Sequence, residues 1–300
     1  MIVRVLGSAA GGGVPQWNCA CSNCAAARSG RIPRRTQSSY AVSADGDRWL
    51  LINCSPDIAA QIEAFTPLQP RAIRGTPIAG MLFTDANVDH IGGLAVLRQS
   101  GNHRFVVRSS DVVREIATAQ AAFEPFAQPP HRWLATAPDG ICAPENASDL
   151  VGTKLTVRAF PLPGTTPGYD GRRRIPGAVT GFTVAEAGSS PSVVFAPVYA
   201  DVSDALRRAI ASASAAFVDG SFFTDGELAA AHMADKSAAS LGHLPVGGED
   251  GSLARLRGSA RLIFTHVNNS NPLLDPTSAA HREVRDAGAE VAWDGMELHL

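Results

Sequence analysis

Short apolar runs in this chain repeatedly end on a carboxylate or a histidine, and this recurrence limits the possible folds more than any other feature. The run 79–83 is followed by the polar stretch Thr84–His90, and later runs end at Asp219 and His266. Each run has the length of a buried strand, and α/β folds gather their sites at the carboxyl ends of strands. The pattern therefore predicts an α/β fold whose functional site forms where these strands end.

The order of the elements predicts one domain that spans residues 1–300. Strands come first, and strands and helices then alternate. With 45% hydrophobic residues, a chain of 300 residues can bury a full core in one compact unit. The expected strands are 1–6, one that ends near Val42, 49–53, 79–83, 104–107, 155–160, 179–184, 192–197, 215–219, 262–266 and a closing pair around 291–293 and 296–300. The expected helices are 55–65, with Ser55 as its N-cap, 89–97, 110–121, 201–211, 250–257 and 276–287; the segment 125–150 is expected to be irregular and 222–240 weakly structured.

Charge and hydropathy exclude two classes of partner. The formal net charge is -2, the sequence pI is near 6.4 and no long basic block occurs, so nucleic-acid binding has no electrostatic basis. The first residues form a strand-like run that is too short for a signal peptide, and no apolar run has the length needed to cross a bilayer. We therefore expect a soluble, cytoplasmic protein without membrane insertion.

Three of the five cysteines, Cys19, Cys21 and Cys24, follow one another at C-x-C-x-x-C spacing. Thiolates at this spacing can converge on one tetrahedral ion from a single loop, whereas the same three residues as unpaired thiols would be reactive liabilities. A closed site of soft thiolates favours zinc in a structural role. The spacing therefore predicts a structural zinc site that takes its fourth ligand from elsewhere in the chain.

Residues 7–13 form a glycine-rich loop after the first strand. The loop lacks the spacing of either phosphate-binding motif, because Val14-Pro15 follows where a helix would have to begin. We expect these glycines to let the backbone pass close to a site or turn with positive φ.

The stretch Thr84–His90, taken alone, favours an acidic helix N-cap. His266, at the end of a distant strand, changes that interpretation. Together with Asp89 and His90 it makes two imidazoles and one carboxylate, a set that leaves positions open for water, substrate or dioxygen and favours non-haem Fe(II). His243 follows a glycine in a loop and is expected to act as a supporting base or merely as a helix cap.

Three consecutive arginines, Arg172, Arg173 and Arg174, lie in a long loop after the strand 155–160. Guanidinium groups bind carboxylates in a bidentate manner, so these residues could hold an acidic substrate. Clustered surface charge is common, however, and the pattern favours a solvated loop.

These motifs, in this order, closely resemble the coenzyme PQQ synthesis protein B family of the metallo-β-lactamase superfamily. The resemblance covers nearly the whole chain and implies an αββα sandwich with the metal at one edge. It rests on Gly7–Gly13, Pro15-Gln16-Trp17-Asn18-Cys19-x-Cys21-x-x-Cys24, Arg35-Thr36-Gln37-Ser38-Ser39, Asn53-x-Ser55-Pro56-Asp57, Asp89-His90, Gly242-His243 and His266-Val267-Asn268-Asn269-Ser270-Asn271-Pro272.

The chain departs from the H-x-H-x-D-H loop of superfamily hydrolases at Asp85 and Asn87, where those enzymes carry histidines. The histidine expected within 161–163 and the bridging aspartate expected near Pro197 are missing as well. A dinuclear zinc hydrolase needs such ligands to hold two ions and activate a bridging water. The resemblance therefore implies a mononuclear site and disfavours hydrolysis.

Two functions are implied by the family. One is Fe- and O₂-dependent hydroxylation of a tyrosine-derived ring in a peptide-derived precursor of pyrroloquinoline quinone (PQQ), and the other is a non-catalytic carrier that moves PQQ or its precursor toward the periplasm. An open metal favours the first. PQQ is thus a candidate ligand, and a homodimer is left open. The assigned residues are Asp89, His90 and His266 as ligands of Fe²⁺, His243 and Asp219 as supporting or substrate-orienting groups, Asp85 and Asn87 as a weak ligand or substrate-binding groups, and Asn269 as the fourth partner of the cysteine zinc.

Overall fold

The computed structural model describes residues 1–101, 103–136, 141–142, 152–189, 191–258 and 260–300. Within these residues the strands form two sheets of seven strands each. The first sheet has the order β14 (Glu297–His299), β1 (Ile2–Gly7), β2 (Ser39–Ser43), β3 (Trp49–Ile52), β4 (Ile78–Leu82), β5 (Val106–Ser109) and β6 (Arg132–Ala135). The second has the order β13 (Glu290–Val291), β12 (Arg261–Thr265), β11 (Ala215–Asp219), β10 (Ser192–Ala196), β9 (Val179–Glu186), β8 (Leu155–Leu162) and β7 (Ile141–Cys142).

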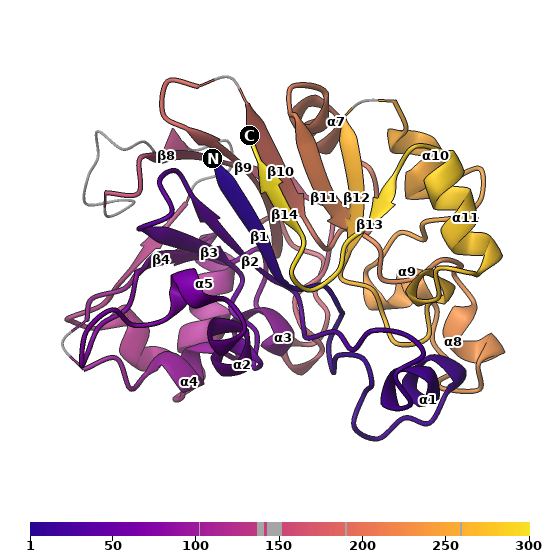
Figure 1. The fold of residues 1–300 in the computed structure, drawn as a ribbon, viewed down its shortest axis with the longest axis horizontal. Helices are drawn as coiled ribbons and strands as arrows, with labels where there is room; N and C mark the ends of the chain where they lie inside the picture. The colour runs from indigo at the N-terminus through magenta and orange to yellow at the C-terminus, as the bar shows by residue number, and fades with distance from the viewer. Residues whose placement is uncertain (102, 137–140, 143–151, 190, 259) are drawn as a thin grey trace.

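The two sheets pack face to face and helices cover their outer faces, so the predicted αββα sandwich is confirmed (Figure 1). Outside the first sheet lie α2 (Ile58–Glu63), α3 (Val88–Ile91), α4 (Leu94–Leu97) and α5 (Asp111–Thr118). Outside the second lie α7 (Asp204–Ala211), α10 (Ser252–Leu256) and α11 (Ala279–Asp286). None of the described helices is both long enough and apolar enough to span a membrane.

Apolar side chains fill the space between the sheets. Tyr40 of β2 packs against Phe195 and Phe217 of the second sheet, with ring centroids 5.1 and 5.3 Å away. Its hydroxyl also hydrogen-bonds with Thr265 Oγ1 at 2.8 Å, which joins the two sheets near the end of β12. Buried aromatic pairs of this kind add to the free energy of area burial and fix the relative position of the sheets.

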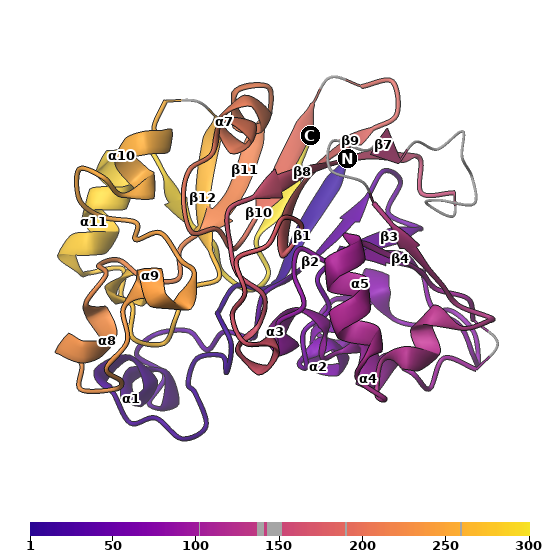
Figure 2. The ribbon, with the colours of Figure 1, turned by 180° about the vertical axis from the view of Figure 1, so that it is seen from behind.

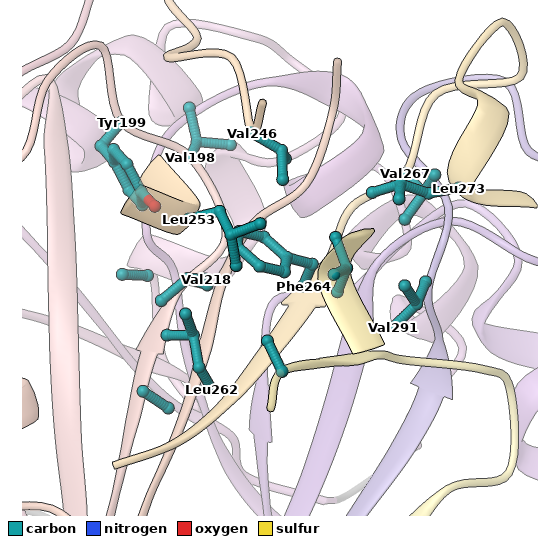
Figure 3. Close-up of a cluster of buried hydrophobic side chains, with 14 of the residues drawn as sticks. Val198, Tyr199, Val218, Val246, Leu253, Leu262, Phe264, Val267, Leu273 and Val291 are labelled. Atoms are coloured by element: carbon teal, nitrogen blue, oxygen red, sulfur yellow. The ribbon is translucent and has the colours of Figure 1, made fainter. Parts of the chain in front are cut away.

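A second apolar layer lies between the second sheet and its helices. Figure 3 shows Phe264 of β12 between Leu253 of α10 and Val291 of β13. All three side chains are buried. Because β12 is covered on both faces, its end at Thr265 is held rigidly, and His266 follows at that rigid point.

Several expected elements differ in the structure. The helix predicted over 89–97 is two short helices, α3 and α4, because Gly92 and Gly93 lie between them in close contact with the chain before α2. A Cβ at Gly93 would lie 2.5 Å from Cys54 Sγ, so only glycine fits there. Ser55 is not the N-cap of α2: Asp57 is, and Ser55 Oγ instead hydrogen-bonds with Gln61 Oε1 at 3.2 Å.

Two segments carry more structure than their composition indicates. The segment 125–150, expected to be irregular, supplies the edge strands β6 and β7, and the rest of it beyond Thr136 lies outside the described residues. The segment 222–240 contains α8 (Glu227–Ala230) and the start of α9 (Ala238–Leu241), and α1 (Ser22–Arg28) was not expected. The predicted closing pair is wrong as a pair, because β13 joins β12 in the second sheet whereas β14 joins β1 in the first.

Candidate metal centre

The loop after β4 and the end of β12 meet at one edge of the sandwich. Asp89 and His90 come from α3, and His266 follows β12. One ligand atom from each of the three residues lies within 4.8 Å of the others, and His266 Nε2 is 3.1 Å from Asp89 Oδ2. The structure thus brings together the three residues that the sequence predicts as ligands; their binding of a metal stays a prediction.

His90 carries the strongest sign that the site fits a metal. Its side chain is fully buried, and its Nε2 has no hydrogen-bond partner among the described residues. A buried nitrogen without a partner is costly, and a metal ion on the side of Asp89, whose Oδ2 is 3.9 Å from this Nε2, would satisfy it. Two imidazoles and one carboxylate are a donor set that suits Fe(II) as well as zinc.

Asp85 holds His90 in the form that a metal needs. His90 Nδ1 lies 2.6 Å from Asp85 Oδ2 and donates to the carboxylate, so Nε2 is the ring nitrogen that a metal would bind once its proton is displaced. The other oxygen of Asp85 accepts hydrogen bonds from the backbone and side-chain nitrogens of Asn87 at 2.9 and 2.7 Å. Both oxygens of Asp85 are therefore hydrogen-bonded and orient their partners, a role that the sequence did not reveal. Asn87, in contrast, lines the cavity next to the site.

His266 has a corresponding support on the second sheet. Ser221 Oγ donates to Asp219 Oδ1 at 2.6 Å and hydrogen-bonds with His266 Nδ1 at 2.7 Å, so the ring nitrogen donates and Nε2 is left for a metal. Ser221 was missed from the sequence, although it stands two residues after the predicted Asp219. His266 itself has a φ of +57°, a conformation that only local packing makes tolerable for a residue other than glycine.

His243 is the third imidazole at the site. Its Nδ1 lies 2.7 Å from Asp219 Oδ2, and its ring stacks on that of His266 with centroids 5.6 Å apart. Asp219, His243 and His266 also form a group with ligand-capable atoms within 4.8 Å. Both oxygens of Asp219 are hydrogen-bonded, one to His243 and one to Ser221; its supporting role stays a prediction.

The charges at the site oppose one another. Burial lowers the pKa of His90, but the carboxylates of Asp85 and Asp89 outweigh it and raise that pKa to about 9. Burial raises the pKa of Asp89, but His90 and His266 hold it well below its usual range. The pKa of His266 is lowered, first by burial and also by the charge of His90. Without metal, His90 therefore holds a proton that a metal would have to displace.

Metal binding is expected to release this proton. A metal must displace it at any pH below the His90 pKa of about 9, so affinity should rise roughly tenfold per pH unit between pH 6 and 9 and then level off. Calorimetric titration with Fe(II) or Zn(II) in buffers of different ionisation enthalpy should show close to one proton released at pH 7. Asp85→Asn removes one of the charges that raise the pKa and should release fewer protons at pH 8; equal release by both proteins would contradict this account.

A cavity of about 180 Å³ opens beside the three imidazole-bearing loops. Gly11 of the glycine loop lines it, and a Cβ there would lie 3.3 Å from Asp89 Oδ2. This confirms that the loop passes close to a site, and Gly12 and Gly13 have the expected positive φ. A second cavity of about 500 Å³ shares Gly11 and Phe222 with the first and extends to Cys19 and Cys21.

The cysteine loop forms a separate cluster. One Sγ from each of Cys19, Cys21 and Cys24 lies within 4.8 Å of the others, and Cys21 is the N-cap of α1. Burial raises the pKa of the Cys24 thiol, but hydrogen bonds from Asn269 and the Gln16 backbone outweigh it and lower that pKa. Three sulfurs at this spacing, one of them with a lowered thiol pKa, fit zinc.

Asn269 lies beside this cluster. Its side-chain Nδ2 is 3.4 Å from Cys24 Sγ, and its backbone oxygen is 3.6 Å from Cys21 Sγ. The amide stabilises a thiolate in this arrangement; its role as the fourth ligand stays a prediction. Asn23 Nδ2 also donates to the backbone oxygens of Asn269 and Asn271 at 3.0 Å, so the cysteine loop holds the segment that follows His266.

Comparison with known sequences and structures agrees with this geometry. Residues 48–267 match the beta-lactamase superfamily domain. The chain is 37% identical over 310 residues to coenzyme PQQ synthesis protein B of Methylococcus capsulatus, covering 100% of both chains. It is 40% identical over 306 residues to the protein of that name from Methylobacterium nodulans, covering 99% of both.

The similar solved structures include a protein of the same name. The crystal structure of Zn(2+)-bound PqqB from Methylobacterium extorquens superposes with a TM-score of 0.92 at 35% identity, covering 100% of both chains. A diphosphatase of the PhnP family, at a TM-score of 0.68 and 20% identity, covers 100% of this chain and 97% of its own and shows the shared fold alone.

Proposed function

This chain belongs to the coenzyme PQQ synthesis protein B family, and we propose that it hydroxylates a tyrosine-derived ring of the peptide-derived PQQ precursor with Fe(II) and O₂. Family membership assigns it to PQQ biosynthesis. The proposal concerns the step within that process.

The proposal rests on His90 Nε2, which is buried and has no hydrogen-bond partner among the described residues. With Asp89 and His266 it makes a three-ligand face, which leaves positions for substrate and dioxygen on one ion. A dinuclear hydrolase would need further ligands on the cavity wall, where Thr165, Thr166 and Val198 lie instead.

Asp89, His90 and His266 would hold the ion, and a bound Fe(II) supplies the chemistry that activates O₂. Asp85 and Ser221 keep the two ligating rings in their metal-binding orientation. His243, bound to Asp219 through Nδ1, presents Nε2 to the cavity and exchanges a proton there with the ring hydroxyl of the substrate. Hydroxylation places one oxygen atom of O₂ on the ring and reduces the other to water, so it also needs a two-electron reductant.

The test is reconstitution without oxygen, followed by exposure to O₂. Protein loaded with Fe(II) and supplied with ascorbate and a cross-linked Glu-Tyr precursor peptide should consume O₂, and the peptide should gain the mass of one oxygen atom derived from labelled dioxygen. Protein loaded with zinc alone is the control and should do neither. No uptake and no mass gain would contradict the proposal, and tight PQQ binding that does not depend on His90 or His266 would favour the carrier function instead.

A further inference from the structure

The loop after β8 forms one wall of the cavity beside the metal centre. Thr165, Thr166 and Arg172 of this loop line the cavity. Figure 2 shows the loop running from β8 toward α3, and the Tyr169 hydroxyl donates to the backbone oxygen of Ala86 between β4 and α3. This contact joins the wall to the loop that carries Asp89 and His90, so a group on the wall has a defined position relative to the metal ligands.

The three consecutive arginines of this loop are not equivalent. Arg173 is paired with Asp170, with its Nη2 and Nε at 2.6 and 3.0 Å from one carboxylate oxygen. Arg172 and Arg174 are both exposed, but Arg174 does not line the cavity. Arg172 lines the cavity, and within the described part of the chain no carboxylate pairs with it. Its charge is therefore available to a ligand.

The backbone holds Arg172 in an unusual conformation. Its φ is +52°, in the left-handed region, and its backbone N–H donates to Pro167 O at 3.2 Å. The guanidinium lies over Gly168, where a Cβ would be in ordinary contact with Nη2 at 3.4 Å. Strained backbone that the surrounding structure maintains is commonly found at ligand-binding positions.

A guanidinium on the cavity wall selects an anionic group. Planar bidentate hydrogen bonding suits a carboxylate, and such charge-assisted pairs are stronger than neutral hydrogen bonds. We propose that Arg172 binds a carboxylate of the ligand in this cavity and so orients the rest of the molecule toward Asp89, His90 and His266. The ligand class is thus a carboxylate; that it is the aromatic PQQ precursor rests on the proposed function.

The test compares PQQ, a tricarboxylate, with its uncharged trimethyl ester as binding probes, without iron or reductant. The wild-type chain should bind PQQ more tightly than the ester. Arg172→Gln should lose about tenfold in affinity for PQQ and little for the ester, the scale of one charge-assisted pair. Arg172→Lys should recover part of the loss, because lysine keeps the charge and lacks the planar fork.

Arg174→Gln is the matched control, since it removes the same charge from the same loop outside the cavity. Unchanged melting temperature and zinc content establish that each variant is folded. The proposal is overturned if the wild-type chain does not distinguish the two probes, or if Arg174→Gln loses as much affinity as Arg172→Gln. These measurements record binding without turnover. Their result can therefore be interpreted even if the hydroxylase assay fails.

Discussion

Replacing His266 with asparagine is expected to remove the active-site metal and to reduce the rate of hydroxylation. The reduction should exceed the roughly 10–100-fold that is lost when a residue hydrogen-bonded to a metal ligand is replaced. His266 Nε2 lies 3.1 Å from Asp89 Oδ2, and without it Asp89 and His90 would supply only two ligands. Asparagine is chosen because it tolerates the φ of +57° at this position better than alanine, yet is too short to replace the imidazole.

Metal analysis and turnover of the same preparation test this prediction. The variant should lose the metal of the Asp89, His90 and His266 site while keeping the zinc of the cysteine loop. His299→Asn is the control, because His299 is an exposed histidine of β14, distant in the sheet from the site, whose side chain hydrogen-bonds with Glu297. Full metal content and activity in His266→Asn would exclude His266 as a ligand.

Replacing Cys24 with serine is expected to release about one zinc and lower the melting temperature. Cys24 is fully buried, and its sulfur accepts hydrogen bonds from the Gln16 backbone and the Asn269 side chain, so the cluster joins two distant segments. In a domain of this size each kcal/mol of lost stability lowers the melting temperature by roughly 2–4 °C, and loss of a structural zinc should cost several. A fall of about 5 °C or more is the expected result.

Cys54→Ser is the matched control for this prediction. Cys54 is a buried free cysteine that lies outside the three-thiol group, so its replacement should cost some stability without releasing zinc. Because Asn23 holds the backbone of Asn269 and Asn271, Cys24→Ser should also loosen the segment after His266 and weaken metal binding there. Unchanged zinc content in Cys24→Ser would refute the assignment of the cluster.

Much of the fold follows from local patterns. The strand runs were predictable because apolar periodicity reports which face of each element is buried, whereas the αββα arrangement was implied by the family resemblance. The division of the helix over 89–97 was not, because Gly93 is required by contacts with Ser55 and Cys54, more than thirty residues earlier. The closing strands β13 and β14 were wrongly assigned to one pair. The periodicity of a single strand shows which of its faces is buried but not which strand lies beside it.

The sequence by itself determined the groups whose members lie close together in the chain. Cys19, Cys21 and Cys24 share one loop, as do Asp89 and His90, so their spacing alone predicts that their ligand atoms can meet. Only the tertiary structure decided how the site is completed. His266 meets Asp89 across 177 positions, and Asp85, Ser221 and Arg172 acquire their roles from partners or a cavity that form only when two sheets pack face to face. Side-chain orientation across that packing depends on both sheets at once, and no single stretch of sequence carries it.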